Sequence, residues 1–207
     1  KNKFLSGGGK STDKLVELVS KAKKSVIIQT PYLIMTRDTR RIFKKLTKSG
    51  VEVKILTNSL ASTDNLEAFS GYQRDRDDIL NTGVEVYEFK PDAKIRQLIM
   101  ADALQETDVD KLPDVIFGLH SKSMVIDDET TVIGTFNLDP RSVNLNTESI
   151  TVLPSHKVAQ EVKAGMLEEM KPENAWRVTK DYNPDKEVSH LKRFRVKLRR
   201  VIPKSIL

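Results

Sequence analysis

Apolar residues in the first 90 positions follow two alternating patterns. Short runs rich in β-branched residues predict buried strands, and the stretches between them carry apolar residues at helical spacing. The predicted strands are residues 25–30, 51–57 and 84–89, and the predicted helices are residues 13–23, 38–49 and 64–81. Strands that alternate with helices are typical of parallel strands joined by crossover connections in an α/β sheet.

The pattern changes in the second half of the chain. Residues 90–114 contain two prolines and an acidic run, and we interpret them as a short helix and a loop over the ends of the strands. Residues 121–127 and 130–136 predict two strands joined by a turn at 127–129, which makes this part of the sheet antiparallel. The remaining predicted elements are a strand over 148–153 and an amphipathic helix over 155–170.

The composition excludes several kinds of catalytic and metal site. The 207-residue chain contains no cysteine, which rules out disulfides, thiolate zinc sites, iron–sulfur clusters and cysteine nucleophiles. Its three histidines, His120, His156 and His190, lack the spacing of a zinc-binding pair, and we expect no metal site. No apolar run in the sequence approaches the ~20 residues of a membrane span.

The first residues resemble a phosphate-binding loop only in part. Residues 7–12 are Gly-Gly-Gly-Lys-Ser-Thr, but the Walker pattern requires a glycine where this chain has Phe4. No predicted strand precedes the segment, so nothing would hold a phosphate cradle in place. We expect residues 1–12 to form a flexible leader to a domain over residues 13–177.

The net charge of +6 is concentrated at the C-terminal end, since the last 19 residues hold seven Lys and Arg and no acidic residue. We therefore expect residues 178–207 to form a basic amphipathic tail. Apolar residues at helical spacing in 191–202 alternate with cations, a pattern typical of helices on anionic bilayers. The candidate membrane contacts are Lys192, Arg193, Arg195, Lys197, Arg199 and Arg200. A helix packed on the body and a nucleic-acid contact are the alternatives.

A cluster of polar residues flanks the two predicted antiparallel strands. His120 and Lys122 stand just before the first strand, and in an extended chain both side chains project from one face. An imidazole beside an ammonium is costly unless an anion lies between them. Thr135 and Asn137 alternate onto one face of the returning strand, and Gly134 allows a close backbone approach. We expect these groups to converge on a phosphate with two ester arms. The alternative is a surface hairpin with incidental polar residues.

Six of these residues at fixed spacing resemble the HKD signature of the phospholipase D superfamily, with Gly-Thr-Phe-Asn in place of the usual Gly-Ser-x-Asn. They are His120, Lys122, Asp127, Gly134, Thr135 and Asn137. Residues 138–148 (LDPRSVNLNTE), 55–89 and the final RRVIPKSIL are similar to the cardiolipin synthases of that superfamily. The resemblance implies a single phospholipase D-like αβα sandwich over residues 13–177, with a mixed sheet flanked by helices on both faces.

The resemblance also implies a two-step transfer of a phosphodiester. One histidine attacks phosphorus and forms a phosphohistidine. A second, protonated histidine gives its proton to the leaving alkoxide and then accepts the proton of the incoming alcohol or water. In a two-motif enzyme His120 would be this general acid and base, and in a symmetric dimer either copy could attack.

The same resemblance assigns roles to the other residues. The implied catalytic set is His120, Lys122, Asn137 and Glu148, and the implied phosphate-binding set is Lys122, Thr135 and Asn137. Glu148 lies where the family places the carboxylate that orients the remaining imidazole nitrogen. Asp127 and Gly134 are expected to be structural, and Asp139 and Arg141 favour a structural ion pair over a substrate contact. No cofactor is implied.

The chain contains one complete motif, since neither His156 nor His190 begins a second. Cardiolipin synthases of this type carry two motifs, each giving half of one active site. We therefore expect the C-terminal half of a phosphatidyltransferase similar to bacterial cardiolipin synthase, or two copies paired about a two-fold axis.

Other functions stay open at this point. The alternatives are a phospholipase D-type hydrolase or secreted effector, a homodimeric single-motif nuclease, and a lipid-binding module without catalysis. The expected partners are a phospholipid, an anionic membrane surface and a second HKD half, and the neutral body disfavours nucleic acid. The expected location is the bacterial cytoplasm or the membrane periphery.

Overall fold

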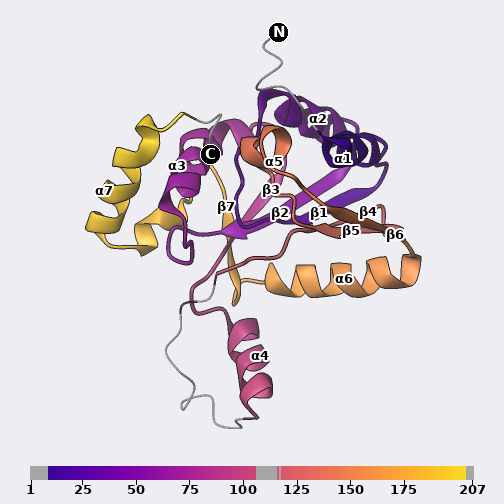
Figure 1. Cartoon of the computed structure of the whole chain (residues 1–207). Helices are drawn as coiled ribbons and strands as arrows, with labels where there is room; N and C mark the ends of the chain where they lie inside the picture. The colour runs from indigo at the N-terminus through magenta and orange to yellow at the C-terminus, as the bar shows by residue number, and fades with distance from the viewer. Residues whose placement is uncertain (1–8, 106–115, 117, 204–207) are drawn as a thin grey trace.

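The computed structural model describes residues 9–105, 116 and 118–203. Its centre is a seven-stranded mixed sheet in the order β6-β5-β4-β1-β2-β3-β7, with helices on both faces (Figure 1). The strands are β1 (Ser25–Gln29), β2 (Glu52–Asn58), β3 (Glu85–Phe89), β4 (Ser123–Ile126), β5 (Thr130–Gly134), β6 (Ile150–Pro154) and β7 (Ala175–Val178). The predicted α/β class, with a mixed sheet between helices, is confirmed.

The first half of the sheet is parallel. β1 pairs with β2 and β2 with β3 in the same direction. Helix α2 (Arg37–Lys48) connects β1 to β2, and α3 (Leu66–Leu80) connects β2 to β3. The side chains of Thr36 and Asn65 each accept a backbone N–H from the first turn of the helix that follows. These N-caps begin both helices directly above the carboxyl ends of the strands.

The second half of the sheet is antiparallel, as predicted. β4 runs back beside β1, and the β4–β5 hairpin continues into β6. Asp127 and Asp128 form the hairpin turn with φ of 55° and 62°, the left-handed conformation that a tight two-residue turn requires. Two elements are absent from the sequence prediction. They are β7, which pairs antiparallel with β3, and the one-turn helix α5 (Pro140–Asn144).

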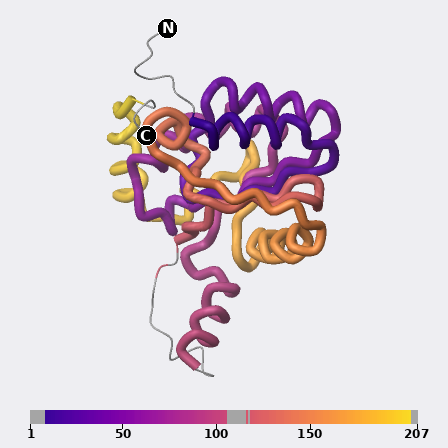
Figure 2. The backbone as a smooth tube through the Cα atoms, turned by 45° about the vertical axis from the view of Figure 1, so that its right-hand side comes forward, coloured from indigo at the N-terminus to yellow at the C-terminus, as the bar shows by residue number. Residues whose placement is uncertain are grey.

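Strand alternation divides the core between the two faces of the sheet. Val26 and Ile28 belong to the cluster under α1 (Lys10–Ser20), α2 and α3. Ile27 belongs to the cluster under α6 (His156–Glu169). Figure 2 shows α1 and α2 on one side of the sheet and α6 on the other. Helix α1 begins at Lys10, so residues 10–12 are helical rather than part of a leader; residues 1–8 lie outside the described residues.

Helix α4 (Lys94–Leu104) stands apart from the layers. It projects away from the sheet (Figure 1), and none of its residues is buried. The predicted short helix is therefore confirmed, but it does not cover the ends of the strands. Leu98, Ile99 and Leu104 remain exposed. Residues 106–115, where the predicted loop falls, lie outside the described residues.

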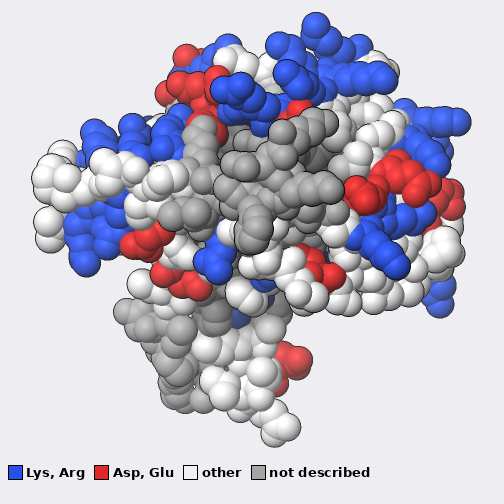
Figure 3. All heavy atoms as spheres, turned by 45° about the horizontal axis from the view of Figure 1, so that its top comes forward, with Lys and Arg blue, Asp and Glu red and all other residues white. Residues whose placement is uncertain are grey.

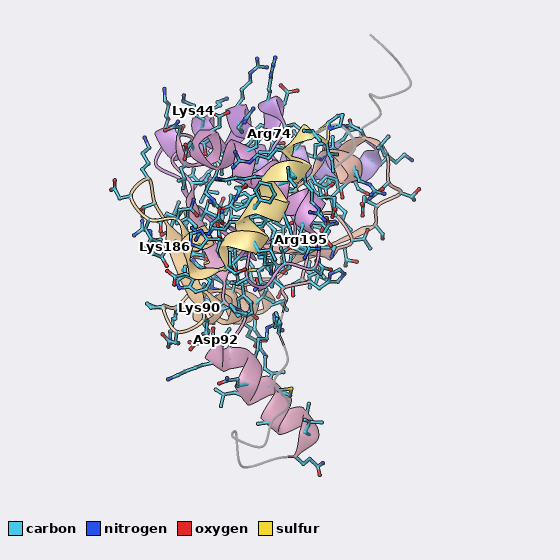
Figure 4. The ribbon with its side chains drawn as sticks, turned by 90° about the vertical axis from the view of Figure 1, so that its left-hand side faces the viewer. Lys44, Arg74, Lys90, Asp92, Lys186 and Arg195 are labelled. Atoms are coloured by element: carbon cyan, nitrogen blue, oxygen red, sulfur yellow. The ribbon has the colours of Figure 1, made fainter. Side chains whose placement is uncertain are left out.

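The C-terminal segment forms helix α7 (His190–Leu198) and the short η3 (Arg199–Val201), which pack on α3. Val196 is the buried residue of α7. The apolar residues on its outer side are exposed: Leu191, Phe194, Leu198 and, in η3, Val201. Figure 4 looks onto α7 and labels Arg195 on it. In the described ranges, no helix has the length and apolar character needed to cross a bilayer.

A buried charge cluster connects this C-terminal segment to the sheet. Arg76 of α3 lies 2.9 Å from a carboxylate oxygen of Glu88 in β3 and 2.8 Å from one of Asp185 in η2 (Pro184–Glu187). Tyr72 donates its hydroxyl to Glu88 at 2.8 Å. Complete burial raises the pKa of Glu88 to about 7, although Arg76 opposes the shift. The cluster spans three separate elements and therefore fixes where the tail leaves the body.

Candidate active site

The predicted site residues meet at one edge of the sheet. β1 and β2 end at this edge, β4 begins there, and β5 ends there. The loop before β4 carries His120 and Lys122, the segment after β5 carries Thr135 and Asn137, and Glu148 precedes β6. None of these residues lies within a strand; Lys122 continues the β4–β5 ladder by one residue, since its carbonyl accepts the Gly134 N–H at 3.1 Å, but strand alternation does not orient the others. Local hydrogen bonds do so instead.

Asn58, the last residue of β2, holds the loop that carries the histidine. Its Nδ2 donates to the carbonyl of Leu119 at 2.9 Å, and its Oδ1 accepts the Leu119 N–H at 2.7 Å. Ser62 donates its hydroxyl to the same Oδ1 at 3.3 Å. A Cβ on Gly118 would lie 3.0 Å from the Ser62 carbonyl, so the loop packs tightly here. The buried amide thus fixes the backbone immediately before His120.

Lys122 is the cation of the site. Its Nζ donates to the carbonyl of His120 at 2.9 Å. Partial burial lowers the pKa of Lys122, and three carboxylates act against that shift. They belong to Glu148, Asp64 and Asp139. The His120 imidazole is exposed, and no described residue forms a hydrogen bond with it. Among the described residues, the site therefore presents an imidazole without a hydrogen-bond partner, and an ammonium that interacts with three carboxylates.

Glu148 is held by its neighbours along the chain. Its carboxylate accepts hydrogen bonds from the Thr135 hydroxyl and, at 3.1 Å, from Asn146 Nδ2. The Ser11 hydroxyl of α1 donates to the backbone carbonyl of Glu148 at 2.9 Å. Within the described residues, Glu148 therefore binds a hydroxyl and an amide rather than an imidazole.

Asn137 is buried and its backbone N–H donates to the Ser142 hydroxyl at 3.2 Å. Its Oδ1 is buried with no hydrogen-bond partner among the described residues. The Asp139 carboxylate accepts the Ser142 N–H at 2.7 Å and caps α5, and burial raises the pKa of Asp139. In the described structure Asp139 serves as a helix cap, Arg141 is exposed and the two form no direct ion pair, although the charge of Arg141 lowers the pKa of Asp139.

The two remaining motif residues support the hairpin. Asp127 lies at the opposite edge of the sheet, where its carboxylate accepts backbone N–H groups at 2.7–3.0 Å. The donors are Lys23, Lys24 and Ser25. A Cβ on Gly134 would lie 2.1 Å from the Ser149 carbonyl, so any side chain there would push β6 away from β5. Asp127 and Gly134 thus fix the two ends of the strands that carry the site.

Sequence reasoning missed two polar residues at the same edge. Tyr32 follows β1 and Asp64 follows β2. The Tyr32 hydroxyl donates to the Asp64 carboxylate at 3.3 Å. Burial, reinforced by Asp64, raises the pKa of Tyr32. Their position was available from the sequence, because ligands of open α/β sheets bind beyond the carboxyl ends of the parallel strands.

An apolar cavity of about 430 Å³ lies next to Lys122, between the sheet and helices α1, α2 and α5. Its wall is mainly aliphatic and aromatic, with Lys122 and Asp139 as its charged residues near the site. In the described parts of the chain, no group of three or more acidic or histidine side chains could hold a metal ion. The site offers an exposed imidazole, a cation and neutral donors, which together suit an oxyanion.

The six predicted membrane contacts differ in their surroundings. Four are engaged with the protein: Lys192 with the Ala61 carbonyl, Arg193 with His190, Arg199 with Glu67, and Arg200 with Gln73. Arg195 and Lys197 are exposed, and no described acidic side chain pairs with them. Figure 3 shows Lys and Arg gathered over α7 at the left of the molecule, next to uncharged atoms.

Comparisons with known proteins agree on one family. Residues 15–170 match the family described as cardiolipin synthase, PLD-like domain. Cardiolipin synthase C of Escherichia coli K12 is 34% identical over 147 residues, which are 71% of this chain and 30% of that protein. An uncharacterised protein of Helicobacter pylori is 34% identical over 145 residues, or 70% of this chain and 27% of the relative. The chain thus spans less than a third of these relatives.

Solved structures share the fold. Phosphatidylserine synthase of Haemophilus influenzae superposes with a TM-score of 0.61 at 16% identity, over 99% of this chain and 46% of that one. Nuc, a phospholipase D family member from Salmonella typhimurium, superposes with a TM-score of 0.56 at 17% identity, over 80% of this chain and 90% of that one. At these identities the likeness concerns the fold alone.

Proposed function

The chain belongs to the family of cardiolipin synthase PLD-like domains, and on that premise we propose that it supplies one HKD half-site of a phosphatidyltransferase that transfers a phosphatidyl group to an alcohol. The observation that carries the proposal is the edge of the sheet where His120 and Lys122 meet Thr135, Asn137 and Glu148. An exposed imidazole is free to exchange protons with a substrate.

Each group has a task in the proposed reaction. The nucleophilic histidine comes from a second half-site, and its nitrogen forms a bond to phosphorus while the bond from phosphorus to the leaving oxygen breaks. Protonated His120 gives its proton to that oxygen. In the second step the hydroxyl of the incoming alcohol loses its proton to His120, its oxygen bonds to phosphorus, and the phosphorus–nitrogen bond breaks.

Lys122 and the Asn137 amide stabilise the phosphate oxygens during both steps. Charge develops on these oxygens in the transition state, and fixed donors stabilise it without reorganisation. The lowered pKa of Lys122 reflects partial burial, where an ammonium interacts more strongly with an anion than in bulk water. Thr135 donates a hydrogen bond to Glu148, and in the proposed reaction Glu148 orients an imidazole of the assembled site.

The second half-site is part of the proposal. The curated relatives are more than three times as long as the matched segment, which supports a partner domain in the same protein. Two copies of this chain related by a two-fold axis are the other arrangement. Co-expression of this chain with the remainder of its gene product, followed by size measurement, distinguishes the two.

The decisive assay mixes the chain, alone and with its second half, with vesicles of phosphatidylglycerol. Mass spectrometry of the lipids should show cardiolipin and free glycerol when both halves are present. Phosphatidic acid as the sole product would assign a hydrolase instead, because water would be the acceptor. No lipid product from the assembled protein would overturn the proposal.

A nuclease is the second candidate. The superposition covers 90% of the Nuc chain, so that phospholipase D family member consists of little more than the fold seen here. A plasmid-nicking assay of the 207-residue chain alone tests this function. Nicking that disappears in His120→Ala, without lipid products, would replace the phosphatidyltransferase by a homodimeric phosphodiesterase acting on DNA.

We also propose that α7 contacts an anionic membrane. Leu191, Phe194 and Leu198 are exposed on its outer side, and Arg195 and Lys197 flank them. Apolar side chains that enter the interface and cations that meet anionic headgroups are the two requirements of such a helix. The catalytic edge and η3 both lie near the N-terminal end of α3, where Glu67 pairs with Arg199, so a docked α7 would bring the site close to the lipid.

A further inference from the structure

The cavity next to Lys122 has no role in the chemistry described so far. It holds about 430 Å³, which falls within the ~300–1,000 Å³ typical of small-molecule sites. We propose that it receives one acyl chain of the phospholipid whose phosphate binds at His120 and Lys122. The proposal rests on the proposed function and adds to it a place for the apolar part of the substrate.

The position of the cavity connects it to the catalytic edge. Lys122 belongs both to the cavity wall and to the phosphate-binding set. Gly134, where β5 ends, is also part of the wall. A chain attached to a phosphate held by Lys122 would therefore begin at the wall of the cavity.

The strand register shows how the cavity deepens. Ile28, Met124 and Val132 are paired across β1, β4 and β5 and form one row on the face under α1 and α2. This row lies two residues below Lys122 along β4, a descent of about 7 Å at strand spacing. All three side chains belong to the cavity wall. The cavity thus becomes apolar as it leaves the catalytic edge.

Helix α1 gives the cavity its length. Thr12, Val16 and Val19 are wall residues on this helix, and Thr12 to Val19 spans about 10 Å of helix. Ser11 at the start of α1 donates to the carbonyl of Glu148, so the N-terminal end of this helix lies next to the site. A flexible hydrocarbon chain matches a cavity that is long and has a mainly apolar wall.

The test measures how affinity depends on chain length. The probes are glycerophosphoglycerol and its monobutanoyl, monohexanoyl and mono-octanoyl derivatives, titrated calorimetrically into the 207-residue chain. Each fully buried methylene contributes about 0.8 kcal/mol, or about fourfold in affinity. The affinity should therefore rise about 15-fold with each two-carbon step that is fully buried. An affinity independent of chain length would overturn the proposal.

Two cavity-filling variants locate the binding site. Val132→Phe fills the deep row, and Val16→Trp fills the α1 side, where Val16 is 43% exposed and a larger residue is tolerated. Both should flatten the chain-length dependence and leave the affinity for glycerophosphoglycerol unchanged. Val158→Phe on α6, at the other face of the sheet, is the matched control and should retain the full dependence. If both filled variants keep it too, the proposal fails.

The remaining outcomes separate this proposal from the proposed function. Lys122→Met should weaken every probe by a common factor, because it removes the ammonium that binds the phosphate, which all the probes share. Chain-length dependence that persists with no effect of Lys122→Met would keep the acyl site and remove the phosphate chemistry. Deleting residues 1–8 tests whether Phe4 and Leu5 fill the cavity instead. Chain-length dependence seen only after that deletion would overturn the proposal.

Discussion

Two clusters of charged residues in this protein are built in opposite ways. At the edge of the sheet, the His120 imidazole is exposed without a described partner and Lys122 is only partly buried. Under α3, Arg76 and Glu88 are buried, with ion pairs and hydrogen bonds among themselves and to Asp185. The first cluster leaves its charges available to a ligand, and the second uses them to join three parts of the chain. Charge alone therefore does not distinguish the proposed site from a structural cluster. The difference is that the charged groups at the sheet edge form no ion pair among the described residues, whereas those under α3 do.

The largest expected effect comes from removing the exposed imidazole of the cluster at the sheet edge. His120→Ala in the assembled protein should lower the rate of phosphatidyl transfer by about 10³-fold, because a general acid and base typically contributes 10²–10⁴-fold. Its unfolding should be unchanged, since the imidazole is exposed. His156→Ala is the control, because His156 is also exposed but contacts the Asp128 carbonyl at the far edge. A loss below tenfold for His120→Ala would remove the residue from the chemistry.

The matching change in the buried cluster is Arg76→Met. It leaves Glu88 and Asp185 buried without their cation, and breaking such a pair costs about 3–5 kcal/mol of unfolding free energy. Denaturant titration measures the loss, and the rate per folded molecule should stay constant. Arg177→Met, which breaks an exposed ion pair with Glu85, should cost at most about 1 kcal/mol. Equal losses in both variants would contradict the contrast between the clusters.

The pH dependence of stability sharpens the comparison. The pKa of Glu88 rises from 4.5 to about 7 on folding, so the folded state binds this proton more tightly than the unfolded chain. Its contribution is complete below pH 4.5 and is lost as the pH rises through 7. The unfolding free energy of the wild type minus that of Glu88→Gln should therefore fall by about 3 kcal/mol between pH 4.5 and 8. A difference that stays constant with pH would refute this assignment.

A smaller effect tests how the loop that carries His120 is held in position. Asn58→Ala leaves the N–H and carbonyl of Leu119 without partners, which costs about 1–3 kcal/mol of stability. The loosened loop should also lower the turnover rate about tenfold. Asn174→Ala is the matched control, because Asn174 is a buried amide that holds backbone groups of Ile95 and Glu168 away from the site. The control should lose stability and keep its rate, and a rate loss common to both variants would assign Asn58 a merely structural role.

The smallest effect concerns α7. Replacing Arg195 and Lys197 by Ala removes two unpaired cations, each worth about 1 kcal/mol at an anionic surface. Binding to phosphatidylglycerol vesicles should weaken about 30-fold at low salt, as measured by co-sedimentation. Lys44→Ala with Lys48→Ala on α2 is the matched pair and should have little effect. Equal weakening by both pairs would indicate general charge attraction rather than docking through α7.

Local patterns predicted most of the fold, because each parallel strand and its helix carry their own periodicity. The four-residue β7 and the one-turn α5 are too short to show a period, and contacts with β3 and with Asp139 define them. In the site, the spacing from His120 to Asn137 was visible in the sequence. The bonds of Asn58 with Leu119 and of Arg76 with Asp185 join residues 61 and 109 positions apart, and a local pattern carries no information on such pairs.

The hydrogen bonds of Asp127 at the hairpin turn give a physical reason for the spacing between His120 and Asp127. From His120 to Asp127 the chain covers about 23 Å if extended, and these two residues lie beyond opposite ends of β4. One inserted or deleted residue would turn Lys122 toward the opposite face while the carboxylate at the far rim stayed bound. The number of residues between His120 and Asp127 therefore sets how far the histidine lies from the fixed hairpin turn. A change in that number should disturb the site more than a change in the identity of the residues between them.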